Sequence, residues 1–270
     1  MNAVASIAPS APLLPGALAR DAMQELASGE VQVWIARLEE TDARALDRCR
    51  AMLNDAELQR LNRLASEPLK AEFLLTRGLC RLTLSAYANV CPKDWEFECN
   101  AYGRPSIASP ANLKMLRFNL TNTRTLVACA VAFDVDIGVD MEPLNRTDDM
   151  LPISTGIFTS AEVLLLRTLG AANRVRRFYE LWTLKEAYAK AKGTGLSELL
   201  DRVSFQPQGS STRACFDSGS GDCEDDWQFE QIDLDCNHLL ALAVHKKRGP
   251  RLRCTFRKTR IDSSAAECFG

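Results

Sequence analysis

A strictly alternating segment, Asp134 to Glu142 (DVDIGVDME), constrains the fold more than any other part of the sequence. Apolar side chains recur at every second position, which predicts a strand with one buried face. The opposite face carries Gly138 and the carboxylates of Asp134, Asp136, Asp140 and Glu142. Like charges on one strand face repel each other. This face is therefore either exposed to solvent or compensated by a hard cation such as Mg²⁺, for which Asp140 and Glu142 at the strand end are suitable ligands.

A helical stripe is the second informative pattern. Phe178, Trp182, Glu186 and Lys190 follow each other at steps of four, so they share one face of a predicted helix. Glu186 four residues before Lys190 is the order of an ordinary exposed ion pair. The aromatic neighbours instead favour a position of Glu186 near the inner face. A carboxylate between Lys185 and Lys190 suits a divalent cation together with a phosphate.

Composition and charge exclude several classes of protein. The 270 residues are 46% hydrophobic and 25% charged, which is typical of globular domains. With 33 basic and 35 acidic residues the net charge is −2, which argues against a nucleic acid partner. No apolar run approaches the roughly 20 residues that span a membrane. The sequence has no P-loop and no G-x-G-x-x-G motif, and its two histidines give a Ser-His-Asp triad little support.

The N-terminus and the cysteines together predict a cytoplasmic protein. Prolines interrupt the apolar stretches of the first 20 residues and no cationic segment precedes them, so we expect a mobile tail rather than a secretory signal. The ten cysteines include no C-x-x-C pair and are spread over the chain. We therefore expect reduced thiols and neither a disulfide framework nor a zinc site.

The order of the expected elements predicts an α+β fold made of two similar lobes. We assign residues 1–30 to a flexible tail, 31–133 to an N-terminal lobe and 134–270 to a C-terminal lobe. Helices are expected over 54–88, with a cap at Asn54 or Asp55, and over 160–169 and 175–192. A Ser/Gly-rich loop is expected over 209–221. Strands are expected over 31–38, 95–99, 118–120, 126–133, 135–142, 227–234, 239–245 and 252–257.

Four motifs, in order, resemble those of the Sfp-type 4′-phosphopantetheinyl transferases. They are GRP at Gly103–Pro105, FNLTNT at Phe118–Thr123, GVDME at Gly138–Glu142 and WTLKEAYAKAKGTGL at Trp182–Leu196. The resemblance implies the fold of that family: a monomer of two pseudo-symmetric α/β lobes with the active site in the cleft between them. It also implies transfer of 4′-phosphopantetheine from coenzyme A to a serine of an apo acyl, peptidyl or aryl carrier protein. The reaction is Mg²⁺-dependent and releases adenosine 3′,5′-bisphosphate.

The resemblance also assigns roles to individual residues. Asp140, Glu142 and Glu186 would be the Mg²⁺ ligands, and Glu186, Asp140 and Lys190 would form the catalytic group. Glu186 is the candidate base for the serine proton, with Glu162 or a metal-bound water as alternatives. Contacts to coenzyme A would come from residues in the motifs and from two arginines of the N-terminal lobe. These contacts are Arg104, Asn119, Thr121, Asn122, Lys185 and Lys190, with Arg77 and Arg81 near the 3′-phosphate.

One position departs from the family pattern. Many relatives have histidine where this chain has Asn122, and asparagine donates a hydrogen bond without carrying a charge. Asn122 is the feature that favours an alternative function, a non-catalytic module that binds coenzyme A or a carrier protein. A third interpretation, an unrelated Mg²⁺-dependent phosphohydrolase, depends on the carboxylates alone.

Overall fold

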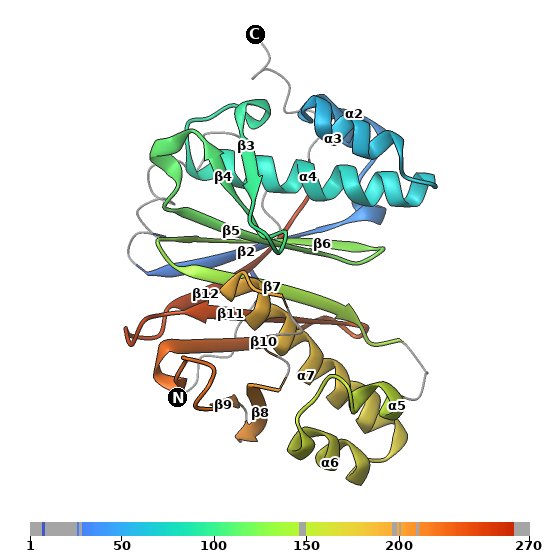
Figure 1. Cartoon of the computed structure of the whole chain (residues 1–270). Helices are drawn as coiled ribbons and strands as arrows, with labels where there is room; N and C mark the ends of the chain where they lie inside the picture. Colours follow the sequence, from blue (N-terminus) through green and yellow to red (C-terminus); the bar gives the residue numbers. More distant parts are fainter. Residues whose placement is uncertain are drawn as a thin grey trace. The chain divides into compact units, whose positions relative to one another are not determined.

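The computed structural model describes residues 7–8, 26, 29–145, 150–195, 199, 201–208 and 211–261. Most of the expected tail (1–30), together with Leu196 and residues 209–210, lies outside the described residues. The chain divides into two compact units (Figure 1). The first comprises 1–99, 105–134 and 252–270, and the second comprises 100–104 and 135–251. Each unit combines helices with sheets, so the predicted α+β class is correct.

The described part of the first unit contains a sheet in the order β1-β12-β2-β6-β5. β12 is parallel to β1 and β2, and the β2–β6 and β6–β5 pairs are antiparallel. The strands are β1 (Ile7–Ala8), β2 (Glu30–Arg37), β5 (Leu116–Asn122), β6 (Leu126–Phe133) and β12 (Arg253–Thr259). The Glu30 carboxylate fixes β12 beside β2, since it accepts from Arg253 at 2.7 Å and from Thr255 Oγ1 at 2.5 Å.

This pairing differs from the expected division of the chain. We expect residues 134–270 to form the C-terminal lobe, whereas β12 belongs to the first unit. Parallel pairing of Arg253 with Glu30 joins residues more than 200 positions apart. No local pattern specifies such a contact, because the alternation of β12, in which Phe256 is buried and Arg253 and Lys258 are exposed, predicts a strand but not the sheet that it joins.

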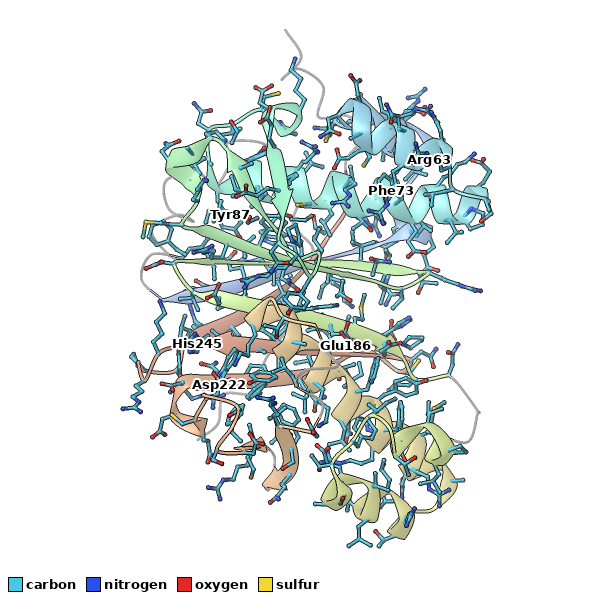
Figure 2. All side chains as sticks on the ribbon, viewed as in Figure 1. Arg63, Phe73, Tyr87, Glu186, Asp222 and His245 are labelled. Carbon is cyan, nitrogen blue, oxygen red and sulfur yellow. The ribbon has the colours of Figure 1, made fainter. Side chains whose placement is uncertain are left out.

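The helices of the first unit pack on one face of this sheet. They are α2 (Ala43–Ala51), α3 (Asp55–Asn62) and α4 (Glu67–Tyr87). Asn54 caps α3 by accepting from the Glu57 backbone N–H at 2.9 Å, while Glu57 reaches back to the Asn54 N–H. The expected helical stretch is therefore two helices. Tyr87, at the end of α4, is labelled in Figure 2. It accepts from Trp34 Nε1 at 2.7 Å and donates to Gln32 at 2.6 Å, so these buried polar groups are paired.

A hairpin formed by β3 (Glu96–Cys99) and β4 (Pro105–Ser109) also belongs to the first unit, whereas its turn, Asn100–Arg104, groups with the second.

Short 3-10 helices occur at Leu38–Glu40, Pro92–Asp94, Ala111–Leu113 and Glu224–Asp226. Within the described residues no helix has the length and apolar character needed to cross a membrane.

In its described part, the second unit has a sheet in the order β10-β11-β7, with both pairs antiparallel. The long helix α7 packs on this sheet (Figure 1). The strands of the unit are β7 (Asp136–Pro143), β8 (Val203–Gln208), β9 (Ser211–Phe216), β10 (Trp227–Asp235) and β11 (His238–His245). Its helices are α5 (Leu151–Ser154), α6 (Ser160–Thr168) and α7 (Ala171–Lys192). The expected loop over 209–221 is partly wrong, because β9 pairs with β8 inside it.

The C-terminal end of α7 is fixed by one carboxylate of the loop between β9 and β10. Asp222 accepts from Tyr188 Oη at 2.5 Å, from Lys192 Nζ at 2.5 Å and from Trp227 Nε1 at 3.0 Å. Gly193 then ends the helix with φ 69°, a left-handed conformation that suits glycine at this position. Both the side chains and the cap therefore determine where α7 stops.

The described cysteines are free thiols, and their burial predicts which of them react. Cys49 is fully buried, and this burial raises the pKa of its thiol to about 12. Cys99 and Cys236 are exposed. We expect iodoacetamide at pH 8 to modify Cys99 and Cys236 in the native protein and to modify Cys49 only after denaturation. Peptide mapping by mass spectrometry checks this, and rapid native labelling of Cys49 would contradict it.

Candidate functional site

The acidic face of β7 is covered by α7. The two backbones are closest at Gly138, where an added Cβ would lie 2.0 Å from Ala187 O and 2.4 Å from Ala191 N. Asp140, on the same face, is only 6% exposed. The predicted alternation of the strand is correct, but full exposure of its acidic face is excluded. The apolar side chains of the opposite face, Ile137, Val139 and Met141, are buried as expected.

Hydrogen bonds from Trp182 and Lys190 join α7 to β7 on either side of Glu186. Lys190 Nζ donates to Asp140 Oδ1 at 2.7 Å and to Val139 O at 3.1 Å. Trp182 Nε1 donates to Glu142 Oε1 at 3.1 Å. Trp182 and Lys190 lie about one helical turn before and after Glu186. The Glu186 carboxyl therefore belongs to the same face of α7 as these two contacts (Figure 2).

The three carboxyl groups act on one another electrostatically. Burial, with the negative charges of Asp140 and Glu142, raises the pKa of Glu186 from 4.5 to about 7, against the lowering effect of Lys190. Glu186 is half-buried, so desolvation of its charged form is the largest cause. The site thus concentrates more negative charge than its one lysine offsets.

The chemistry of these donors fits a hard divalent cation. Carboxylate oxygens are the ligands that Mg²⁺ prefers, and a cation would relieve the mutual repulsion that raises the pKa of Glu186. The present side-chain positions do not form a closed ligand set: within the described residues no three His, Cys, Asp or Glu side chains are arranged to hold a metal ion. Asp140 is turned to Lys190 and Glu142 to Trp182. The donor types of the three carboxylates therefore fit Mg²⁺.

Lys185 does not occupy the position that the motif resemblance implies. It is 1% exposed, pairs with Glu162 at 3.0 Å and donates to Val203 O at 2.6 Å. Its ammonium group points into the second unit and is not available to a phosphate. Glu162 is also buried and accepts from the backbone N–H of Thr159 and Phe205, which argues against it as the base. The predicted phosphate contact of Lys185 and the alternative role of Glu162 as the base are therefore both corrected, because the two side chains form one buried ion pair.

Arg104 in the GRP turn contacts the end of α7. Its guanidinium donates to Ala191 O at 2.7 Å and to Asp136 Oδ1 at 2.8 Å. Asn100 in the same turn donates to Gly193 O at 2.7 Å. Cationic and amide donors at a helix C-terminus satisfy carbonyl groups that have no partner within the helix. Arg104 therefore joins the start of β7 to the end of α7, a role that the expected phosphate contact did not include.

The two arginines of α4 differ in accessibility. Arg81 is fully buried, donates to Pro92 O at 3.1 Å and Trp95 O at 2.7 Å, and pairs with Glu57 at 2.6 Å. The expected 3′-phosphate role of Arg81 is therefore corrected, since its guanidinium is used inside the first unit. The Arg77 guanidinium lies over the Phe73 ring, and its side chain is 23% exposed.

The FNLTNT segment lies mostly on β5, and its polar residues are in different environments. Asn119 and Thr121 are buried, at 3% and 4% exposure. Asn122 is exposed and donates its amide N–H to the Glu72 carboxylate of α4. Asn122 itself carries no charge, and it uses an amide donor on the Glu72 carboxylate.

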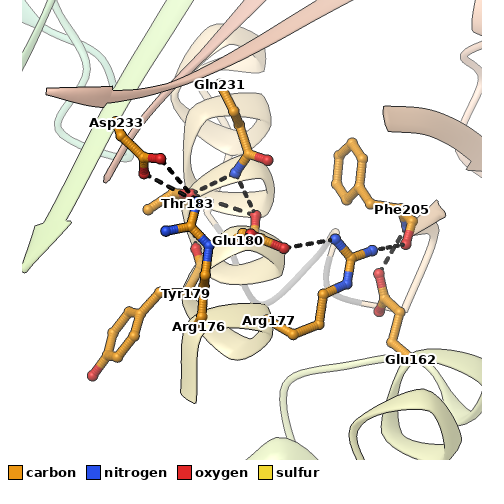
Figure 3. A network of polar contacts seen from close by, with 9 residues as sticks. All are labelled: Glu162, Arg176, Arg177, Tyr179, Glu180, Thr183, Phe205, Gln231 and Asp233. Carbon is orange, nitrogen blue, oxygen red and sulfur yellow. Dashed lines mark hydrogen bonds and ion pairs between the residues drawn. The ribbon is translucent and has the colours of Figure 1, made fainter. Parts of the chain in front are cut away.

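Sequence reasoning missed a polar network on the other side of α7 (Figure 3). Glu180 accepts from Arg176 and from Arg177, each at 3.0 Å, and Arg177 also donates to Phe205 O at 3.2 Å. The Phe205 N–H donates to Glu162 at 2.9 Å, so β8, α6 and α7 are linked. The signal in the sequence was the capping pattern from Thr159 to Glu162, which predicts the helix start but not its second partner.

Comparison with known proteins gives consistent matches. Residues 136–243 match the model of the 4′-phosphopantetheinyl transferase superfamily. The 4′-phosphopantetheinyl transferase HetI of Nostoc sp. (strain PCC 7120) is 33% identical over 174 residues, 64% of this chain and 73% of the relative. The 4′-phosphopantetheinyl transferase Sfp of Bacillus subtilis is 31% identical over 134 residues, 49% of this chain and 57% of the relative. A solved holo-(acyl-carrier-protein) synthase from Bacillus anthracis, in complex with CoA (3′,5′-ADP), aligns with a TM-score of 0.35 and 19% identity, over 42% of this chain and 97% of that one.

Proposed function

Because this chain belongs to the 4′-phosphopantetheinyl transferase superfamily, we propose that it transfers 4′-phosphopantetheine from coenzyme A to a serine of an apo carrier protein. The single observation that best supports an active transferase is the α7–β7 site, where Glu186 shares its electrostatic environment with Asp140 and Glu142. Relatives that match this chain are named for the same transfer.

In the proposed reaction, the serine oxygen forms a bond to the phosphorus that carries the pantetheine group. The phosphoanhydride bond to the nucleotide breaks, and adenosine 3′,5′-bisphosphate leaves. We assign Glu186, the half-buried carboxylate beside Asp140 and Glu142, as the acceptor of the serine proton. No nucleophilic side chain of this chain is required, since the nucleophile belongs to the carrier.

We propose that Asp140, Glu142 and Glu186 hold Mg²⁺. A bound Mg²⁺ supplies positive charge that offsets the charge of the leaving phosphate. Lys190, which pairs with Asp140, would contact a coenzyme A phosphate if Mg²⁺ were held by Asp140 in its place. In the first unit, Arg77 remains a proposed contact for an anionic group, because its side chain is partly exposed.

Intact-mass spectrometry tests the transfer directly. An apo acyl, peptidyl or aryl carrier is incubated with the protein, coenzyme A and Mg²⁺, and a parallel sample contains EDTA. We expect a gain of one phosphopantetheine that is absent with EDTA, because the chelator removes the Mg²⁺ whose charge would offset that of the leaving phosphate. No gain on any of the three carriers, with coenzyme A binding retained, would favour a non-catalytic binding module.

A further inference from the structure

We propose that the buried Glu162–Lys185 ion pair positions α7 so that Glu186 faces Asp140 and Glu142. The inference rests on the proposed function, because it concerns the carboxylates that we assign to that reaction. It gives Glu162 and Lys185 a positioning role, distinct from the base and phosphate roles that the motif resemblance implied.

Glu162 uses both of its oxygens in buried contacts. Oε1 accepts from the Phe205 N–H at 2.9 Å. Oε2 accepts from the Thr159 N–H at 2.9 Å and from Thr159 Oγ1 at 3.1 Å, and pairs with Lys185 Nζ at 3.0 Å. The side chain is 2% exposed. One carboxylate thus ties the start of α6 and the strand β8 to α7, and Figure 3 shows its bond with Phe205 of β8.

Lys185 holds the α7 side of this contact. Its Nζ donates to Val203 O at 2.6 Å and lies 5.8 Å from the centre of the Phe158 ring. The side chain is 1% exposed, so the pair is screened very little by water or salt. Lys185 therefore fixes α7 to a frame made of α6 and β8.

The position of this contact on the helix determines what it controls. Lys185 is adjacent to Glu186, and successive residues of an α-helix are separated by about 100° of rotation. Trp182 and Lys190 hold the face that carries Glu186 against β7, while Lys185 holds a neighbouring face against α6 and β8. Rotation or sliding of α7 would break contacts on both faces. Contacts on two faces of α7 thus fix the rotation of the helix that directs Glu186 toward β7.

Stability alone does not require charges at this place. Replacing a buried ion pair by apolar residues of similar volume is often neutral or stabilising, whereas an apolar contact has no directional geometry. The hydrogen bonds from Phe205, Thr159 and Lys185 converge on one carboxylate with defined directions. The pair is therefore suited to fix the position of α7. Replacing both residues together tests this role, because loss of the whole pair is expected to affect the position of α7 more than the stability of the fold.

The test is the double variant Glu162→Gln/Lys185→Met. Glutamine keeps an amide oxygen for the Phe205 N–H, and methionine keeps the unbranched apolar stem. We expect kcat for carrier modification to fall about tenfold or more, with KM for coenzyme A within about threefold of the wild type. We also expect the Kd for Mn²⁺, measured by electron paramagnetic resonance on the free protein, to rise about tenfold, as when residues that orient metal ligands are removed.

Arg176→Gln is the matched control on the same helix. It removes the contacts to Glu180 and Asp233, whose side chains are 22% and 50% exposed, and it leaves the Lys185 side of α7 intact. We expect kcat and the Mn²⁺ affinity of this variant to stay within about twofold of the wild type. If the double variant does not fold, as judged by circular dichroism, Glu162→Asp replaces it, because it keeps the charge and shortens the reach to Lys185.

The outcomes are distinct. A folded variant whose kcat and Mn²⁺ affinity both match the wild type would overturn the positioning role, as would equal factors of change in kcat and in KM. Wild-type protein that modifies no carrier would instead overturn the proposed function, and the Mn²⁺ titration would still decide whether the ion pair positions the carboxylates.

Discussion

Replacing Glu186 by glutamine is expected to reduce transfer by about a hundredfold or more and, at the same time, to make the metal-free protein more stable at pH 8. The two effects have one cause. Glu186 shares its surroundings with Asp140 and Glu142, and burial makes its charged form unfavourable. Glutamine removes that charge and with it the carboxylate that we assign to the metal and to the serine proton.

The sign of the stability effect follows from the direction of the pKa shift. The pKa of Glu186 is about 7 in the folded chain and about 4.5 when the chain is unfolded. Between these values the folded state binds more protons, so its stability falls as pH rises. The charged Glu186 thus lowers the stability of the folded wild type above pH 7 and has no such effect below pH 4.5. Because Glu186 is partly exposed, solvent screening makes the effect smaller than the full pKa shift implies. We expect Glu186→Gln to raise the free energy of unfolding by about 1 to 2 kcal/mol at pH 8 and by little at pH 5.

Urea unfolding of both proteins in EDTA at pH 5 and pH 8 measures this difference. Glu180→Gln is the control, since Glu180 lies on the same helix between Arg176 and Arg177, each at 3.0 Å. Removing a compensated charge is expected to lower the stability of that variant by about 0.5 to 1 kcal/mol at pH 8. A loss of stability in Glu186→Gln at pH 8 would show that its carboxylate is compensated in the free protein.

Replacing Gly138 by alanine is expected to destabilise the second unit by about 3 kcal/mol or more. The new Cβ would lie 2.0 Å from Ala187 O and 2.4 Å from Ala191 N. These neighbours are backbone atoms of a long helix, so a side-chain rotation cannot relieve the clash. Because β7 and α7 must separate, we also expect the bonds from Trp182 to Glu142 and from Lys190 to Asp140 to lengthen, with loss of transfer.

Thermal and urea unfolding of Gly138→Ala test the clash, and intact-mass spectrometry of a carrier tests the site. Gly156→Ala provides the comparison, because its nearest neighbour, Ile153 O, would be 3.9 Å from the added Cβ. We expect that substitution to change the stability by less than about 0.5 kcal/mol. Equal stability of the two alanine variants would mean that β7 and α7 do not approach each other as closely as the structure places them.

The candidate site was predictable from the sequence where its residues repeat at a regular spacing. The period of two in residues 134–142 placed Asp136, Gly138, Asp140 and Glu142 on one face, and the period of four placed Trp182, Glu186 and Lys190 on another. These local patterns depend on backbone geometry alone. The structure then brings the two faces together at Gly138. Each pattern predicted its own face, but neither predicted that the two faces would be in contact.

The partners of the basic residues were not predictable in the same way. A lysine or arginine side chain reaches several ångströms, and its sequence position does not say into which part of the fold it points. Lys185 and Arg81 are buried against Glu162 and Glu57, although the sequence motif and the basic helix suggested phosphate contacts. Such long-range pairs depend on tertiary packing, because a buried basic group is stable only when a particular carboxylate lies beside it.

The sequence by itself determined the α+β class, most helices and strands, the family and the three acidic residues of the candidate site. It could do so because periodicity, caps and ordered motifs are local. Only the tertiary structure decided that β12 joins the first unit, that α7 covers the acidic face of β7, and that Arg104 and Lys185 hold this helix. These features depend on contacts between distant segments, whose geometry exists only once the chain is folded.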